Sequence, residues 1–309
     1  MWMFLFRRVL QSIPVIIGVA LIALALTELS GDPTRALLGS RTSPEIVEKV
    51  KAFYGRDKPW HTRFLTYLSR LGQGDLGVSI ANHGLPVTDL VVKGIGFTLK
   101  LALGAIIIAV SLGMLAGIFS AWRPNSWIDY AASGLAAIGI SFPAFFLAML
   151  FQKLFAVNLK WFPIGGYGEG QLEYLILPCL SLGLISTASI ARLTRNCLLE
   201  ANAQDYVRTG RAKGLGEWTT LLGHALPNAL VPVVTVIGTD FAGLLTGAVL
   251  TETVYGLPGI GSVLSKAIFE RDLPVVTGCC VVMALIFILA NLVVDLLYAL
   301  LDPRIRYAD

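Results

Sequence analysis

Ionisable side chains are rare inside the long apolar segments of this 309-residue sequence, and two carboxylates stand out there. Asp240 lies in the middle of the apolar stretch VIGTDFAGLLTG, and Asp295 lies in NLVVDLLY. A charge near the centre of a bilayer costs about 2.5–3.5 kcal/mol on insertion scales, so each carboxylate needs a reason to be there. Asp240 fits either the lining of a water-filled route for a cationic solute or a hydrogen-bonded helix interface. Asp295 fits a structural partner better than a solute ligand. We take Asp240, Asp295, Thr239 and Ser141 as candidate pathway residues.

The residues that usually carry catalysis or bind metals do not form a cluster in this sequence. The four cysteines all lie in or beside apolar segments: Cys179, Cys197, Cys279 and Cys280. The three histidines, His61, His83 and His224, are isolated, so we expect no metal site. An intramembrane enzyme would need a nucleophile with a base at the same depth, and neither Ser141 nor Ser181 has one. We therefore expect no catalytic residue and no cofactor.

The composition explains which elements must hold these side chains. Hydrophobic residues make up 55% of the chain and charged residues only 14%, against roughly 25% charged in a soluble domain. Mean hydropathy is +0.73, and several continuous apolar runs exceed the ~18 residues needed to cross a bilayer. Barrel strands would alternate in polarity, which these runs do not. The net charge of +4 is spread along the chain, so no nucleic-acid partner is expected. The sequence predicts an all-α polytopic membrane protein in contact with lipid.

Six membrane spans are predicted. Their approximate ranges are 9–29, 101–121, 128–155, 174–193, 225–250 and 275–301. Pro143, Pro178 and Pro232 are each expected to bend their helices. The pairs Gly113-x-x-x-Gly117 and Gly243-x-x-x-Gly247 have the small-residue spacing that lets helices approach closely. Glu252, near the end of the fifth span, is expected at the membrane interface.

Positive charge in the short loops gives the orientation. Ten lysines and arginines fall on one side: Arg7, Arg8, Arg123, Arg192, Arg195, Arg208, Arg211, Lys213, Arg304 and Arg306. The opposite short loops carry only Lys160, Lys266 and Arg271, so both termini are predicted to be cytoplasmic.

The orientation predicts a domain organisation. It consists of an anchor helix (1–29), an external helical subdomain (30–97), a five-helix core (98–301) with a cytoplasmic loop at 194–224, and a cytoplasmic tail (302–309). Helices of the external subdomain are expected to begin at Thr42-Ser43-Pro44, at Pro59 and after Pro86.

The cytoplasmic loop contains a polar stretch, 203–213, that predicts a short surface helix of about 16 Å. Tyr206, Val207 and Gly210 are expected on one side of this helix. Arg208, Arg211 and Lys213 fall on other sides, and Gly214 should end the helix. An ordinary basic loop is the alternative interpretation.

The spacing in this loop matches a known pattern. Gly214 is followed by nine residues and then by His224-Ala225-Leu226-Pro227. This resembles the loop signature of ABC-importer permeases, with Arg208-Thr209-Gly210 where Glu-Ala-Ala would stand and His224 where isoleucine would stand. The stretches DYVRTGRAKGL (205–215) and HALPNALVPVVT (224–235) resemble the dipeptide/oligopeptide/nickel permease family. Further matching motifs cover nearly the whole chain, among them GDLGVS (74–79), SFP (141–143), PGIG (258–261), RDLPVV (271–276) and NLVVDLLYALLDPRIR (291–306).

The resemblance implies a type I ABC-importer permease of the bacterial inner membrane and a set of partners. These are a second, homologous permease subunit, two cytoplasmic ATPase subunits and an extracytoplasmic substrate-binding protein. The sequence fits this division of labour because it lacks a G-x-x-x-x-G-K-[ST] phosphate-binding loop. The short helix would then dock into an ATPase subunit. The residues expected at that contact are Asp205, Tyr206, Val207, Arg208, Arg211, Ala212, Lys213, Gly214 and Leu215.

The expected function is import of dipeptides or oligopeptides, with the ATPase activity on the partner subunits. Nickel, metal chelates and glutathione are alternative substrates of the same machinery. A secondary transporter working alone is a more remote alternative, because it would predict inverted repeats or several intramembrane charges.

Overall fold

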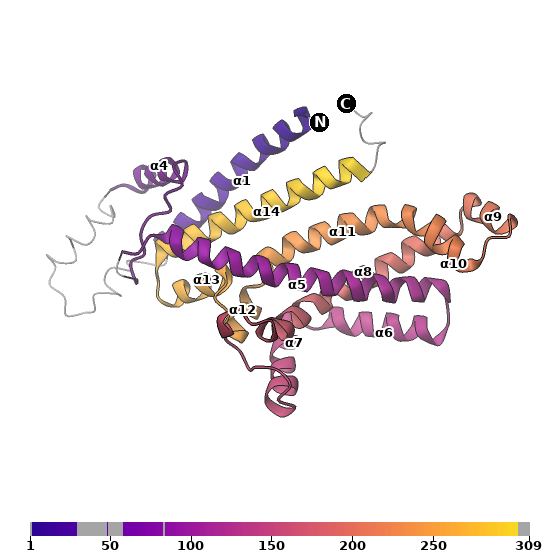
Figure 1. Ribbon diagram of the computed structural model, residues 1–309. Coiled ribbons are helices and arrows are strands. Elements are labelled where there is room, and N and C mark those ends of the chain that lie inside the picture. The colour runs from indigo at the N-terminus through magenta and orange to yellow at the C-terminus, as the bar shows by residue number, and fades with distance from the viewer. Residues whose placement is uncertain (1, 30–47, 49–57, 83, 302–309) are drawn as a thin grey trace. The chain divides into compact units, whose positions relative to one another are not determined.

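The computed structural model describes residues 2–29, 48, 58–82 and 84–301, and its named elements are all helical (Figure 1). They are α1 (Trp2–Leu29), α4 (Trp60–Leu71), α5 (Val87–Trp122), α6 (Trp127–Ser141), α7 (Ala144–Phe151), η1 (Gln152–Asn158), η2 (Gly168–Gly170), α8 (Glu173–Asn202), α9 (Asp205–Ala212), α10 (Glu217–Thr220), η3 (Leu221–Ala225), α11 (Leu226–Gly247), α12 (Val249–Tyr255), α13 (Ile260–Phe269) and α14 (Leu273–Leu301).

Five of these segments are long and apolar enough to cross a membrane. They are Phe6–Leu26, Val87–Trp122, Glu173–Asn202, Glu217–Thr246 and Leu273–Leu296. In the region of the sixth expected span, Trp127–Ser141 and Ala144–Asn158 pass the test together but meet at a bend of 104°, which fits either a broken span or a re-entrant loop. Pro143 accounts for the break, because proline has no amide hydrogen to donate within a helix and forces the preceding residue, Phe142, into an extended conformation. The polytopic helical fold is confirmed.

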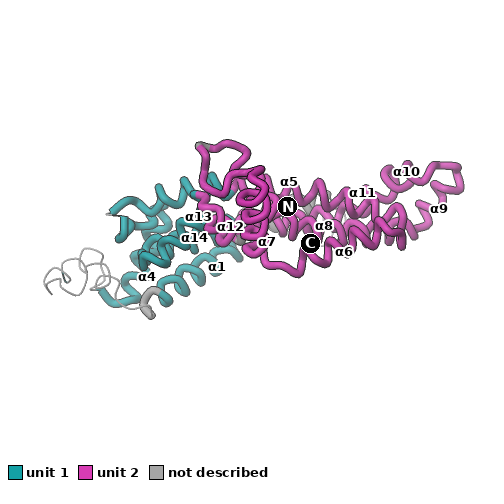
Figure 2. The backbone as a smooth tube through the Cα atoms, turned by 90° about the horizontal axis from the view of Figure 1, so that it is seen from below, with its two compact units in different colours: residues 1–98, 258–288 teal, residues 99–257, 289–309 magenta. Residues whose placement is uncertain are grey.

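The chain divides into two compact units, residues 1–98 with 258–288 and residues 99–257 with 289–309 (Figure 2). The first unit has a core of buried apolar side chains: Leu76, Val87, Val91, Ile260, Ala267, Val275 and Cys279. The start of α5 approaches α13 so closely that a Cβ on Gly94 would lie 2.8 Å from the backbone nitrogen of Ile260. That nitrogen donates to Thr98 Oγ1 at 3.0 Å. These contacts fix the start of α5 against α13.

The first unit also has a buried carboxylate. Asp272 accepts hydrogen bonds from the Ser79 hydroxyl and from the backbone nitrogens of Ile80 and Ala81, the latter two at 3.2 and 3.1 Å. Its side chain therefore ties the loop before α5 to the beginning of α14.

Two expectations for the segment before the second span have different outcomes. The helix expected from Pro59 is present as α4. The helix expected after Pro86 also begins there, at Val87, but it is not separate: it is the start of the 36-residue helix α5, which continues into the span without a break. The helix expected from Thr42-Ser43-Pro44 lies outside the described residues.

In the second unit, α8 is the central helix and packs against α11, α6 and α7 (Figure 1). Glycines on α5 permit its close approach to α8. A Cβ on Gly113 would lie 2.9 Å from Thr187 O, and one on Gly117 would lie 2.6 Å from Thr194 Cβ. A Cβ added to Gly243 would have no heavy atom within 4 Å, so this glycine, unlike Gly113 and Gly117, is not at a close helix contact among the described residues.

Candidate functional site: the short helix between α8 and α11

The sequence between α8 and α11 forms the expected short helix. This helix, α9, spans Asp205–Ala212, two residues shorter at its start and one at its end than predicted. In Figure 1, α9 and α10 lie beyond the adjacent ends of α8 and α11. Residues 194–202 of the predicted loop are helical, because they form the last turns of α8. Thr194 and Leu198 of those turns are fully buried, which explains why the helix continues past the apolar run.

Glycine ends α9 as expected, through two hydrogen bonds characteristic of the Schellman motif. Gly214 N donates to Arg211 O at 2.9 Å, and Leu215 N donates to Gly210 O at 3.3 Å. Gly214 has φ +84°, a left-handed conformation in which side chains are strained. The Leu215 side chain packs back on the helix, with Cδ1 3.6 Å from the Cβ position of Gly210. The chain therefore reverses sharply and in a defined direction after α9.

One face of α9 is anchored in an apolar cluster. Val207 is fully buried, and its neighbours come from α5, α8, η3 and α11: Ala121, Leu198, Ala201, Leu221, Ala225 and Ala229. Gly210 is also buried, one turn further along the same face. Because the cluster draws on four other elements, α9 is fixed to the ends of several helices at once.

A second anchor follows α9. Trp218 of α10 packs edge-on against Phe119, with ring centroids 5.9 Å apart, and against Trp122, with centroids 4.5 Å apart. Both partners lie in the last turn of α5. The Arg123 guanidinium also contacts Trp122: its carbon atom lies 4.6 Å from the centroid of the Trp122 ring. Sequence reasoning missed Trp218, although an aromatic residue in an otherwise polar stretch was a usable signal.

The rest of the surface of α9 is charged and exposed. Arg208 has a side chain 71% exposed and lies 3.6 Å from Asp205, and Arg211 lies 3.1 Å from Glu217. Surface pairs of this kind contribute about 0–1 kcal/mol, so both guanidinium groups can exchange these partners for others. Of the expected contact residues, all except Val207 are exposed: Asp205, Tyr206, Arg208, Arg211, Ala212, Lys213, Gly214 and Leu215.

The side of α9 that carries Tyr206, Val207 and Gly210 is buried only in part, because Tyr206 is 41% exposed. Each residue advances about 100° around a helix, so Val207 and Gly210 centre the buried face about 70° away from Tyr206. Tyr206 therefore lies at the edge of the buried face, beside the charged surface.

The candidate pathway residues are spread over several helices. Asp240 of α11 is half-buried, and its carboxylate lies near the Ser186 side chain of α8. Thr239 and Ser141 are exposed and bond within their own helices, to Val236 O at 3.0 Å and to Ala137 O at 2.8 Å. Asp295 is half-buried on α14. The structure thus brings Asp240 to the α8–α11 interface, whereas Thr239 and Ser141 turn to the outside of the described chain.

Sequence reasoning also missed the burial of three polar residues of the second unit. Glu252, expected at the interface, is fully buried in α12, as is Tyr255. The Tyr255 hydroxyl donates to Ala148 O at 3.0 Å, and burial raises the pKa of Tyr255 to about 12. The third residue is Asp129 near the start of α6, which pairs with Arg195 of α8. The Ser126-x-x-Asp129 spacing, which is typical of a helix N-cap, could have indicated from the sequence that Asp129 lies in the first turn of a helix.

Among the described residues, no group of three or more histidine, cysteine, aspartate or glutamate side chains has an arrangement that could hold a metal ion.

Comparison with known proteins agrees with this architecture. Residues 113–307 match the family model described as "Binding-protein-dependent transport system inner membrane component". The chain belongs to this family. It is therefore a multi-pass membrane component of an ABC importer, and the transport systems of this family include ATPase and substrate-binding partners.

Curated relatives of this family cover almost the whole chain. The dipeptide transport system permease protein DppB of Alkalihalophilus pseudofirmus is 39% identical, over 97% of this chain and 98% of its own length. The oligopeptide transport system permease protein OppB of Escherichia coli K12 is 38% identical, over 98% of this chain and 99% of its own length.

A solved structure supports the fold. A chain of the MetNI methionine ABC transporter, in an inward-facing conformation, aligns with a TM-score of 0.59 at 19% identity. The alignment covers 69% of the present chain and 96% of that chain. The expectation of a type I importer permease fold is confirmed.

Proposed function

We propose that this chain is a permease subunit of a peptide importer and that α9 docks into a cytoplasmic ATPase subunit. In this proposal the chain pairs with a second, homologous permease subunit, and two ATPase subunits bind on the cytoplasmic side. A substrate-binding protein delivers dipeptides or oligopeptides from outside. Both termini are cytoplasmic, and the membrane is the bacterial inner membrane. The substrate class follows the names of relatives that cover the full length of the chain.

The observation that carries the proposal is the construction of α9. Its buried face is fixed by Val207, and the chain after it is fixed by Trp218, while Arg208, Arg211 and Lys213 remain exposed. A short helix held this firmly does not move by itself. Any force on its exposed face is therefore passed to the ends of α5, α8 and α11.

The docking proposal is tested by reversing charge on α9. We expect Arg208→Glu with Arg211→Glu to weaken co-purification with the ATPase subunits and to reduce transport-coupled ATP hydrolysis. The matched control is Lys266→Glu on α13, a side chain 68% exposed that the proposed topology places on the opposite side of the membrane. Unchanged assembly and hydrolysis in the double variant would refute docking through α9.

The domain organisation follows from the same topology. We propose that 1–29 is an anchor helix, 30–97 an external subdomain, 98–301 the core and 302–309 a cytoplasmic tail. Cysteine accessibility at Lys213, Lys266 and Arg123 tests this arrangement in intact cells. Lys213 and Arg123 should be protected from an impermeant reagent, and Lys266 should react.

Substrate choice within the machinery has its own test. Vesicles containing the complete transporter should take up labelled dipeptides or oligopeptides when ATP and the loaded binding protein are present. Uptake of nickel, a metal chelate or glutathione in place of peptides would favour the alternative cargo without changing the docking proposal.

A further inference from the structure

The end of the α5–α6 hairpin is joined to α8 by a buried ion pair. Arg195 of α8 donates to Asp129 through Nε and through a terminal guanidinium nitrogen, each at 2.6 Å. The Asp129 side chain is only 4% exposed and Arg195 is 23% exposed. Two parallel bonds fix the angle between the groups as well as their distance. The pair therefore constrains α8 and the start of α6 to one relative orientation.

The remaining lone pairs of Asp129 hold the hairpin turn itself. The Ser120 hydroxyl of α5 donates to Asp129 Oδ1, and the backbone nitrogen of Asn125 donates to Oδ2 at 2.9 Å. Asn125 has φ +60°, so the turn is tight. One carboxylate thus connects α5, the turn, α6 and α8.

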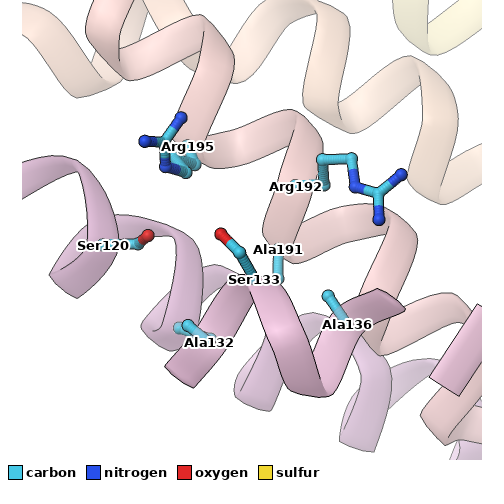
Figure 3. Close-up of a pocket in the computed structure, with 8 residues that line it drawn as sticks. Ser120, Ala132, Ser133, Ala136, Ala191, Arg192 and Arg195 are labelled. Atoms are coloured by element: carbon cyan, nitrogen blue, oxygen red, sulfur yellow. The ribbon is translucent and has the colours of Figure 1, made fainter. Parts of the chain in front are cut away.

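A small, partly open pocket adjoins the ion pair and is lined largely by small side chains: Ala116, Ser120, Ala132, Ser133, Ala136, Ala191, Arg192 and Arg195 (Figure 3). Helices α6 and α8 pack against each other, but the small side chains at this level make non-directional contacts that do not fix the angle between the helices. The ion pair is therefore the main directed connection there.

The same hairpin end is also in contact with the segment after α9. Trp218 stacks on Trp122, which lies close to Asn125 in the chain. Arg195 lies seven residues before the end of α8, about 10 Å along its axis. The α9–α10 segment is thus linked to the α5–α6 hairpin twice, through aromatic rings on one side and through α8 and the ion pair on the other.

We propose that Asp129 and Arg195 are positioning residues that transmit displacement of α9 to the α5–α6 hairpin. This inference rests on the proposed docking of α9 to an ATPase subunit. When α9 is displaced, α8 moves with it, and the two hydrogen bonds between Arg195 and Asp129 move the α5–α6 hairpin in the same direction. Without the pair, α8 moves past the hairpin at the pocket, and ATP hydrolysis is less well converted into transport.

The test measures solute molecules transported per ATP hydrolysed by the complete transporter in proteoliposomes with a loaded binding protein. We expect Arg195→Gln and Asp129→Asn each to lower this ratio roughly fivefold or more. The double variant should lose no more than either single one, because both changes remove the same link. Arg195→Lys should lower the number of solute molecules transported per ATP by less than Arg195→Gln does, since lysine keeps the charge but cannot form both parallel hydrogen bonds.

Arg192→Gln is the matched control. It removes the same charge one turn away on α8, and Figure 3 shows the Arg192 side chain directed away from Arg195. Among the described residues Arg192 has no ion-pair partner, so the control should leave the ratio unchanged.

Two outcomes would overturn the inference. One is an unchanged ratio in variants whose melting temperature falls, which would make the pair only structural. The other is an equal fall in the Arg192→Gln control. If a glutamine or asparagine variant does not fold, the Arg195→Lys variant alone decides between transmission and structure. Failure of docking is recognised separately, because it appears as lost co-purification of the ATPase subunits.

Discussion

The indole ring of Trp218 lies 4.5 Å from that of Trp122, centroid to centroid, with an interplanar angle of 36°. This contact fastens α10 to the last turn of α5 and limits how far the α9–α10 segment can move. Aromatic contacts of this kind contribute about 0.5–1.5 kcal/mol beyond the apolar area they bury.

Replacement of Trp218 should loosen the segment without unfolding the bundle. We expect Trp218→Ala to lower the free energy of local unfolding by about 1–3 kcal/mol and to speed hydrogen exchange of the α9 amides. Trp218→Phe should retain most of the protection. The control is Trp127→Ala, since Trp127 is 78% exposed. Equal exchange of α9 amides in the wild-type and Trp218→Ala proteins would contradict the assigned role.

Gly214 should be sensitive to substitution, whereas its neighbour Gly216 should not. Gly214 has φ +84° and Gly216 has φ −62°, and neither has a heavy atom within 4 Å of an added Cβ. The comparison therefore isolates backbone conformation from packing. Gly214→Ala should destabilise α9 and the turn after it by about 1–2 kcal/mol. This loss is measured as faster hydrogen exchange of residues 205–215, and Gly216→Ala should leave that exchange unchanged. Equal effects at the two positions would exclude the left-handed turn.

The glycines of α5 and α11 provide a second matched comparison. An added Cβ at Gly117 would lie 2.7 Å from Ala191 O and 2.6 Å from Thr194 Cβ, whereas Gly243 has open space. Gly117→Ala should push α5 away from α8 and cost about 1–3 kcal/mol, measured as a lower melting temperature in detergent. Gly243→Ala should leave the melting temperature unchanged. A fall at Gly243 instead would show that a partner subunit packs there.

Asp240 provides a prediction about the solute. If its carboxylate faces the route, Asp240→Asn should lower uptake of positively charged peptides roughly tenfold, equivalent to about 1.4 kcal/mol, and leave neutral peptides unaffected. Asparagine has nearly the same size as aspartate and keeps one side-chain oxygen, so the change removes charge rather than the contact between α11 and α8. Ser186→Ala is the converse control. Equal uptake of charged and neutral peptides by Asp240→Asn would assign Asp240 to helix packing alone.

Local features were predictable from the sequence. The position of α9 followed from a polar stretch bounded by apolar runs, and its end followed from Gly214, because helix caps depend on a few neighbouring residues. The break at Pro143 was equally local, although the sequence did not indicate its angle. The six apolar segments followed from hydropathy, since no other backbone structure satisfies its hydrogen bonds in lipid as simply.

Contacts between residues distant in sequence were not predictable. The sequence marks Arg195 only by its charge, and nothing near it in the chain indicates Asp129 as its partner. Trp218 and Glu252 raise the same difficulty, because burial of a residue near a helix end depends on which other helix ends meet there. A helical period also does not fix how far the buried face extends, so the sequence alone could not show that Tyr206 is exposed while Val207 is buried.

The interruption at Phe142 and Pro143 bears on how the nascent chain enters the bilayer. Helix α6 has 15 residues, about 22 Å of helix, and α7 with η1 supplies a similar length after the corner, whereas the hydrocarbon layer is about 30 Å thick. Neither half is long enough to be integrated alone, so the biosynthetic machinery must release both into lipid together. A charged residue introduced into α6 or into α7 should therefore prevent the whole segment from 127 to 158 from entering the membrane during synthesis.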